Sequence, residues 1–465
     1  MKPIRYITIL LLLPLLFSCE DLIEVNPPED KLIQDVVFDS DETATSAMDG
    51  IYNQLFLAEF SSGQRSSVTV LSGLSGDNIK FINPNTSTAM QFEQHEILPD
   101  NNRNLEIWAS AYNVIYMSNS LLKGLQESGN ISLELKAQLE GEARFVRAFT
   151  YFYLTNMYGD VPLILSINYE ENQLVSRNYS SEVYDAIIED LKIAGDILSP
   201  EYRTGERTRV NKYASLALLS RVYLYLEDWQ MAETISSEVI NESGTYELLD
   251  DPNLVFLANS REAIWQISPI GAGGSITQTN EGSLFIIDPI FSFFASFKLN
   301  EAFVEKFEEQ DNRLLNWVGY NEGMNASFPY KYKVWSSNEF PILEYSMVLR
   351  LAEQYLIRAE ARAEQGNLTE AINDLDAIRS RAGLDLITDT NSEISQEDLL
   401  SAILNERRME LFAEWGHRWF DLKRTEKANA VFGPVNPYWE PTDVLYPVPE
   451  DERSKNSNLS QNPGY

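Results

Sequence analysis

Apolar residues recur at steps of three and four along much of the chain, which is the spacing of one face of an α-helix. Residues 133–158 and 107–125 show this pattern, and the first of these segments meets Gly159 and Pro162, which end a helix. Another helix is expected after Ser180 or Ser181, either of which can cap its start. Its apolar positions are Val183, Ile187, Leu191, Ala194 and Leu198.

Two later segments, residues 213–240 and 351–378, resemble each other. Each carries two small residues 12 positions apart on either side of a short turn, and these pairs are Ser220 with Ala232 and Ala359 with Ala371. Small side chains at this spacing let two antiparallel helices approach closely, as in a tetratricopeptide unit, although two unrelated helical hairpins are the plainer alternative. Such a unit cannot bury its face alone, so we expect four hairpins to stack.

The fold class that follows is dominated by α-helices, with tetratricopeptide-like repeats and a loop-rich variable region. We expect one domain over residues 37–465, with repeats at about 44–60, 105–240 and 345–425. The variable region is expected at about 61–104, which is rich in Ser, Gly, Asn and Thr, and at about 245–343, which mixes apolar runs, glycines and aromatics. Binding residues gather on such loops. Residues 426–465 hold many prolines and are expected to wrap the surface.

The N-terminus is typical of a secretory signal that ends at a cysteine. Basic residues come first, residues 7–17 are mostly apolar, and Cys19 is the only cysteine, so no intramolecular disulfide is possible. The apolar run is too short to span a bilayer. Leu16-Phe17-Ser18-Cys19 resembles the lipobox of bacterial lipoproteins, although an ordinary signal with a chance cysteine is the alternative. We expect residues 1–18 to be removed, Cys19 to be acylated, and residues 19–36 to form a tether.

The charge of the chain limits its partners and its chemistry. The formal net charge is −34, and it becomes −36 when Lys2 and Arg5 leave with the signal. Such a charge repels phosphate backbones, so nucleic acid is excluded as a partner. The only two histidines, His95 and His417, lack metal-ligand spacing, and residues 271–275 lack the lysine of a phosphate loop. We therefore expect no metal, no cofactor and no catalytic residues.

A block of charged residues near His417 could be drawn as a catalytic cluster. It lies on an expected helix and its end, beside large apolar residues, and such paired charges more often lock helix ends together. We therefore favour a structural role for the block. Its members are Arg407, Arg408, Glu410, His417, Arg418, Asp421 and Arg424.

Seven segments, taken in order, resemble the SusD/RagB family of outer-membrane nutrient-uptake lipoproteins. The resemblance implies a helical scaffold of four tetratricopeptide-like repeats with a variable region. It also implies a lipid-anchored protein of the cell outer membrane, facing the exterior, that captures oligosaccharides and passes them to a TonB-dependent, SusC-like β-barrel transporter. The segments begin at Ser18, Asp49, Trp108, Glu142, Tyr158, Leu351 and Glu406, the last running to Arg424, and the tail from Tyr446 also matches.

Other functions stay open at this point. A lipid-anchored surface glycan hydrolase is one alternative, because the sequence alone cannot distinguish a catalytic carboxylate pair among 70 acidic residues from a solvated face. A peptide-binding member of the same importer family is another, and a general tetratricopeptide interaction scaffold is a third. We interpret the chain as a binding protein and not as an enzyme.

A sugar site needs exposed aromatic rings beside hydrogen-bonding groups, and both occur in the variable region. We expect Phe81, Asn83 and Phe285 to share one shallow site on the face toward the transporter, although a core position is the ordinary alternative for any large aromatic residue. No tryptophan lies in residues 61–104, which argues against starch. The candidates are Asp77, Asn78, Phe81, Asn83, Asn85, Gln278, Phe285, Phe294, Trp317 and Trp335, with Asn280, Phe291 and Tyr320 as further members.

Overall fold

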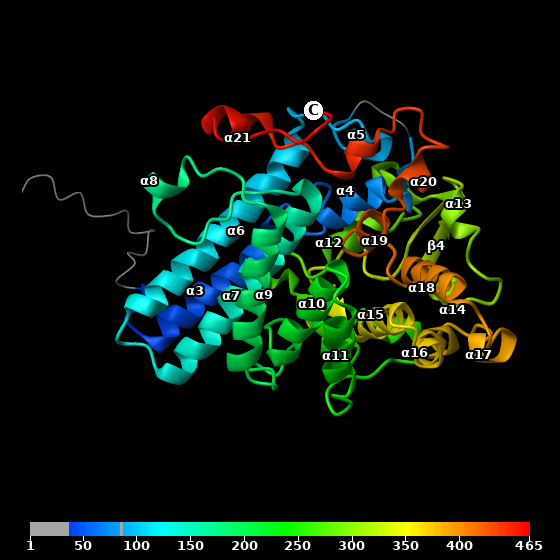
Figure 1. Ribbon diagram of the computed structural model, residues 1–465, viewed down its shortest axis with the longest axis horizontal. Helices are drawn as coiled ribbons and strands as arrows, with labels where there is room; N and C mark the ends of the chain where they lie inside the picture. The colour runs from blue at the N-terminus through cyan, green and yellow to red at the C-terminus, as the bar shows by residue number, and fades with distance from the viewer. Residues whose placement is uncertain (1–36, 84–86) are drawn as a thin grey trace, which may run out of the picture.

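The computed structural model describes residues 37–83 and 87–465, so the expected signal, Cys19, the tether and Asn85 lie outside the described residues. Helices dominate the described part, as the sequence predicts (Figure 1). The longer helices are α3 (Asp41–Leu57), α6 (Asn102–Glu127), α7 (Leu133–Tyr158), α9 (Ser180–Ile197), α10 (Lys212–Tyr225), α11 (Trp229–Ile240), α15 (Leu351–Glu364), α16 (Leu368–Arg381) and α18 (Gln396–Glu410). The shorter ones are α4 (Val68–Ser75), α5 (Met90–Gln94), α8 (Tyr169–Asn172), α12 (Asn280–Phe285), α13 (Glu301–Val304), α14 (Asn312–Trp317), α17 (Ile387–Thr390), α19 (His417–Arg424), α20 (Ala428–Phe432) and α21 (Glu450–Lys455).

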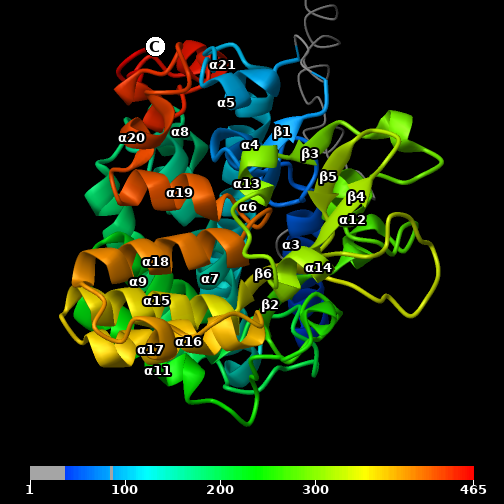
Figure 2. The ribbon, with the colours of Figure 1, turned by 90° about the vertical axis from the view of Figure 1, so that its right-hand side faces the viewer.

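The long helices form a continuous stack of antiparallel pairs. Helices α3, α6, α7 and α9 lie side by side, and α10 with α11 joins them to α15, α16 and α18 (Figures 1 and 2). The small residues of the two similar segments, Ser220, Ala232, Ala359 and Ala371, are all fully buried where α10 meets α11 and α15 meets α16. Tetratricopeptide-like packing is therefore confirmed.

Local sequence explains where these helices begin and end. Helix α7 ends at Gly159, which adopts φ 72°, and the α15–α16 turn contains Gly366 at φ 80°, a region that favours glycine. The start of α9 differs slightly from the prediction. Its cap is Tyr179, whose backbone N–H donates to the Glu182 carboxylate at 3.1 Å, in place of a serine cap.

The charged block near His417 is a buried ion-pair network between helices. Glu410, which is fully buried, pairs with Arg313, Arg350 and Arg381. Burial by itself would raise the pKa of Glu410, but these three guanidinium groups hold it well below its ordinary value. Burial lowers the pKa of His417 well below its ordinary value, and nearby arginines lower it further, so this ring is neutral.

The rest of the block ties neighbouring elements in the same way. Asp421 accepts from Arg407 at 3.0 Å and from Arg424 at 2.8 Å, and Arg424 reaches Glu360 on α15 at 2.6 Å. Every one of these side chains is largely buried among helices, which supports the structural interpretation of the block. A buried charge that lost its partner would be strongly destabilising.

Short strands connect the helical stack to the loop-rich side. Within the described residues they form three antiparallel pairs: β1 (Ile79–Phe81) with β3 (Phe297–Leu299), β2 (Ala263–Ile267) with β6 (Ser346–Arg350), and β4 (Val318–Asn321) with β5 (Ala326–Pro329). Phe81 lies opposite Phe297 in the first pair. Figure 2 shows β1, β3, β4, β5 and α12 on one side of the helices, whereas β2 and β6 pack against α10.

The C-terminal segment lies across the ends of several helices. Tyr446 is fully buried, and its backbone N–H donates to Met157 O at 2.8 Å at the end of α7. Asn462 donates to Tyr158 O at 2.9 Å, and Asn104 on α6 donates to Pro447 O at 2.7 Å. None of the helices in the described residues combines the length and apolar character needed to cross a membrane.

Candidate ligand-binding site

A pocket of about 660 Å³ lies where the two halves of the loop-rich region meet the start of α6. It is called the aromatic pocket below. Residues from three separate parts of the chain line it: Glu59, Gln64, Arg65, Ser66, Arg103, Glu106, Ile276, Gln278, Asn280, Ser283, Leu284, Ile286, Phe291, Phe294, Ala295 and Trp335.

Aromatic rings form one wall of this pocket. Phe291 stacks on Trp335 with ring centroids 5.5 Å apart and planes inclined by 16°, and Phe294 lies 6.5 Å from Phe291. Phe291 is 42% exposed and Phe294 is 62% exposed. The Asp288 carboxylate accepts from the N–H of Phe291 at 2.9 Å, which fixes the turn that carries the rings. The wall offers accessible ring faces, which large aromatic residues seldom do.

Polar and charged groups also line this pocket, and they are called its polar wall below. Arg103 donates to Ser66 Oγ at 2.8 Å, and Ser66 donates to Glu106 at 2.7 Å. Arg65 donates to Ser296 at 2.7 Å, and no described carboxylate lies within ion-pair distance of Arg65 or Arg103. The arginines therefore keep donors available for a ligand.

Burial and neighbouring charges shift the pKa values of these groups. Burial raises the pKa of Glu59, and Glu106 raises it further, while Arg103 acts in the opposite sense. Burial lowers the pKa of Arg65, and the charge of Arg103 adds to the effect. A pocket lined by both apolar ring faces and hydrogen-bond donors and acceptors can hold a sugar by its C–H face and its hydroxyls.

Five of the residues proposed from the sequence meet in the aromatic pocket. They are Gln278, Asn280, Phe291, Phe294 and Trp335. Gln278 accepts from the N–H of Ser337 at 2.8 Å, which places the segment that carries Trp335. Asn280 donates to Ser62 O at 2.8 Å, which joins the two halves of the loop-rich region.

The expectation of exposed rings is wrong for Phe81, Phe285 and Trp317. Phe81 and Phe285 both pack on Phe297, with centroids 4.9 Å and 6.4 Å away, and are 7% and 2% exposed. Trp317 is fully buried, and its Nε1–H donates to Pro252 O at 2.9 Å. These rings belong to the core, so the shallow site expected from Phe81, Asn83 and Phe285 does not exist in that form.

The remaining candidates lie away from the aromatic pocket. Asp77 accepts from Arg408 at 3.0 Å and from Arg418 at 3.1 Å, and Asn78 is buried and accepts from Arg408 at 2.8 Å. Both residues therefore anchor the loop after α4 to the charged block. Asn83 and Tyr320 are exposed but do not line the pocket.

Sequence reasoning missed the polar wall of the aromatic pocket. Arg103 and Glu106 are three residues apart at the start of a helix, so they lie on one helix face. That pattern is also typical of an ordinary solvated surface and does not indicate a site. Arg65 lies in a segment expected to carry the site, yet no other sequence feature marks it.

The fold defines a tetratricopeptide-like helical-repeat protein whose loop-rich side carries the aromatic pocket. Two family models match the chain: one described as the SusD family over residues 328–465, and one described as "Starch-binding associating with outer membrane" over residues 22–224. The chain is therefore a SusD-like protein.

Individual relatives agree with this placement. SusD-like protein P2 of Formosa agariphila is 26% identical over a match that covers 99% of each chain. Starch-binding protein SusD of Bacteroides thetaiotaomicron is 25% identical, and that match covers 70% of this chain and 72% of SusD.

Solved structures share the fold. A SusD superfamily protein from Bacteroides vulgatus superposes with a TM-score of 0.80 at 19% identity, covering 92% of this chain and all of that one. A structure described as a laminarin-binding SusD-like protein gives a TM-score of 0.78 at 23% identity, with the same coverage.

Proposed function

We propose that this protein is a cell-surface substrate-binding lipoprotein that captures oligosaccharides and passes them to a TonB-dependent, SusC-like outer-membrane transporter. One observation carries the proposal: the accessible Phe291–Trp335 stack and several hydrogen-bonding side chains line the same pocket of about 660 Å³. An oligosaccharide has apolar C–H faces ringed by hydroxyls, and this arrangement matches both.

The relatives support a glycan as the ligand class. Among them, one is named as a starch-binding protein and one as a laminarin-binding protein. Starch and laminarin are both neutral glucans, so neutral gluco-oligosaccharides are the first ligands to test. The description "associating with outer membrane" supports a position at that membrane.

A binding experiment tests the proposal. The purified protein is screened on a glycan array, and the best oligosaccharide is titrated by calorimetry against wild type and Trp335→Ala. The substitution should weaken binding about tenfold or more, because a central aromatic contact commonly contributes more than 1 kcal/mol. Phe340→Ala is the matched control, since Phe340 is 62% exposed but does not line the pocket.

Two outcomes would contradict the proposal. Equal affinity in wild type and Trp335→Ala would show that the glycan does not bind in the aromatic pocket. Release of shorter products during incubation would favour the hydrolase alternative, which chromatography of the ligand detects.

The anchor and the partner need their own tests. Cys19→Ala should move the protein from the membrane fraction to the soluble fraction, because stable attachment depends on acyl chains. Equal retention of the variant in detergent-free fractionation would contradict lipidation at Cys19. Affinity purification of the full chain from its native membrane should bring down a barrel-sized protein, and its absence would argue against the transporter partner.

A further inference from the structure

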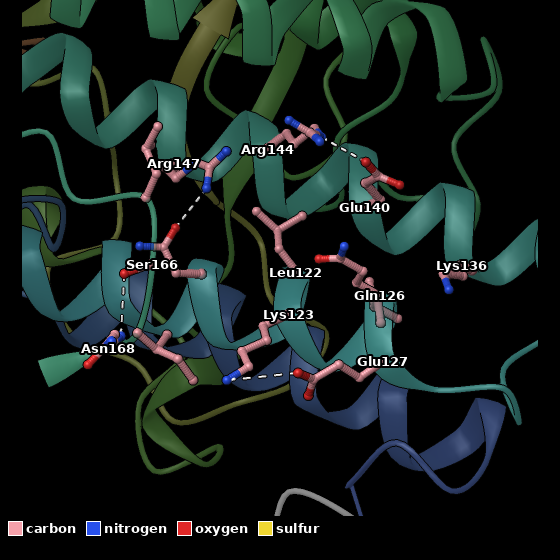
Figure 3. Close-up of a pocket in the computed structure, with 14 residues that line it drawn as sticks. Leu122, Lys123, Gln126, Glu127, Lys136, Glu140, Arg144, Arg147, Ser166 and Asn168 are labelled. Atoms are coloured by element: carbon pink, nitrogen blue, oxygen red, sulfur yellow. Dashed lines mark hydrogen bonds and ion pairs between the residues drawn. The ribbon is translucent and has the colours of Figure 1, made fainter. Parts of the chain in front are cut away.

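A second and larger groove, of about 930 Å³, lies on the helical scaffold. It is called the α6–α7 groove below. The C-terminal half of α6 and the N-terminal half of α7 form its sides, and residues 165–168 border it (Figure 3). It shares no lining residue with the aromatic pocket, and none of the described residues that line it is aromatic. Ring stacking therefore cannot hold a ligand here.

Cationic side chains outnumber carboxylates in the lining of this groove. Four cationic side chains line it, Lys123, Lys136, Arg144 and Arg147, against two carboxylates. The whole chain carries a net charge of −34, with 70 acidic and 36 basic residues. An excess of cations in a partly enclosed groove of such a protein creates a local site for a negative group.

Part of this charge holds the helices together. Arg147 donates to Asp190 on α9 through two nitrogens at 2.8 Å each, and to Asn119 on α6 at 2.7 Å. Arg144 shares the same Asp190 at 2.8 Å and also pairs with Glu140 at 2.9 Å. This side of the groove is therefore an ion-pair network, in which every nitrogen of Arg147 already donates one hydrogen bond to a protein oxygen.

Other side chains of this groove are uncommitted. Lys136 makes no ion pair with any described residue, and Gln126 makes no side-chain hydrogen bond to one. Both project into the space between α6 and α7 (Figure 3). Lys123 reaches Glu127 only at 3.9 Å, and these side chains are 48% and 59% exposed. Such a pair contributes little to stability, so a structural role does not account for these three side chains.

We propose that the α6–α7 groove is a second ligand site, which binds a compact oxyanion: a sulfate, phosphate or carboxylate group. Lys136 and Lys123 supply the charge, and Gln126 supplies a neutral donor. Arg144 belongs to the same lining, and its Nη2 makes no hydrogen bond to a described residue. Charge-assisted hydrogen bonds to such groups are stronger than neutral ones. The oxyanion could belong to an acidic or sulfated sugar or to a lipid headgroup. The inference does not rest on the function proposed for the aromatic pocket.

Calorimetry with inorganic sulfate and with a sulfated monosaccharide tests the site, using the full chain, Lys136→Gln and Lys306→Gln. Lys306 is an exposed lysine outside the groove, so its substitution changes the net charge equally. We expect Lys136→Gln to lower affinity about tenfold, which corresponds to about 1.4 kcal/mol, because the variant cannot make a charge-assisted hydrogen bond. Lys306→Gln should bind like wild type, and the melting temperature of both variants should stay unchanged.

Further binding measurements distinguish whether the anion belongs to a sugar or to a lipid. The uncharged parent sugar should not bind in the groove. Vesicles of phosphatidylglycerol and vesicles of phosphatidylcholine are compared in co-sedimentation. Binding to the sulfated sugar that is lost in Lys136→Gln assigns the site to an anionic sugar. If Lys136→Gln loses binding to phosphatidylglycerol vesicles and to no other probe, the site is assigned to a lipid headgroup. Equal binding by wild type and Lys136→Gln to every probe, or binding to none, overturns the proposal.

Discussion

Phe291 stacks on Trp335 with planes inclined by only 16°, although the two residues come from separate loops. Because each ring supports the other, their contributions to oligosaccharide binding should be coupled. We expect Phe291→Ala and Trp335→Ala each to weaken binding, and the double variant to lose less than the two losses combined. The coupling should be about 0.5–1.5 kcal/mol.

Calorimetry on the four proteins of this cycle measures the coupling. Phe293→Ala serves as the control, because Phe293 is 70% exposed and adjacent to the stack but does not line the aromatic pocket. Strictly additive losses would mean that the rings contact the ligand independently.

Glu281 should make stability depend on pH. It is 3% exposed, its Oε1 accepts from Ser346 at 2.5 Å, its Oε2 has no hydrogen-bond partner among the described residues, and burial raises its pKa from 4.5 to about 7. A raised carboxyl pKa means that the folded state binds the proton more tightly than the unfolded state. This contribution is therefore present below pH 4.5 and is lost as pH rises through about 7.

Glu281→Gln mimics the protonated form and isolates this effect. The free energies of unfolding of variant and wild type should be similar near pH 4.5. Above pH 7 the variant should be more stable, by a margin on the order of 3 kcal/mol. Urea unfolding at a series of pH values checks this, and a difference that does not change with pH would contradict it.

Two glycines with positive φ should respond differently to alanine. Gly416 has φ 69°, and a Cβ there would lie 2.5 Å from Ser72 Cβ, whereas Gly366 has φ 80° and open space around it. Gly366→Ala should cost about 1–2 kcal/mol from backbone strain alone. Gly416→Ala should cost about 2 kcal/mol more, because overpacking adds to the strain. Thermal or urea unfolding compares the two, and equal losses would show that the contact with Ser72 relaxes freely.

Ala371→Trp should be strongly destabilising. Ala371 is fully buried where α16 meets α15, so a large ring there would force the two helices apart, at a cost of about 1–3 kcal/mol or more. Ala109→Trp is the control, since Ala109 is exposed on α6. An unchanged melting temperature for Ala371→Trp would contradict close packing of this hairpin.

The helical scaffold was predictable because its signals are local. The spacing of apolar residues indicates α7, and Gly159 and Pro162 mark its C-terminal end, so the helix runs over Leu133–Tyr158 as expected. The small residues Ala359 and Ala371 indicate the α15–α16 hairpin for the same reason. Each of these signals lies within a few turns of the structure that it specifies.

The site was predictable only to the level of segments. Phe285 and Phe294 lie nine residues apart and look equivalent in sequence, yet Phe285 is 2% exposed and Phe294 is 62% exposed. The difference depends on Phe297, which follows them and covers Phe285 and Phe81 from β3. Contacts between residues far apart in the sequence decide which face of a short loop points to water. No local sequence pattern encodes such contacts.

The rings of the aromatic pocket lie on short segments outside the helical stack, where Asp288 holds the turn before Phe291. Arg103 and Glu106 of the same pocket lie on α6, which is part of the stack. We therefore expect the rings to tolerate substitution at little cost in the free energy of unfolding, whereas changes at Arg103 or Glu106 act on a helix of the scaffold.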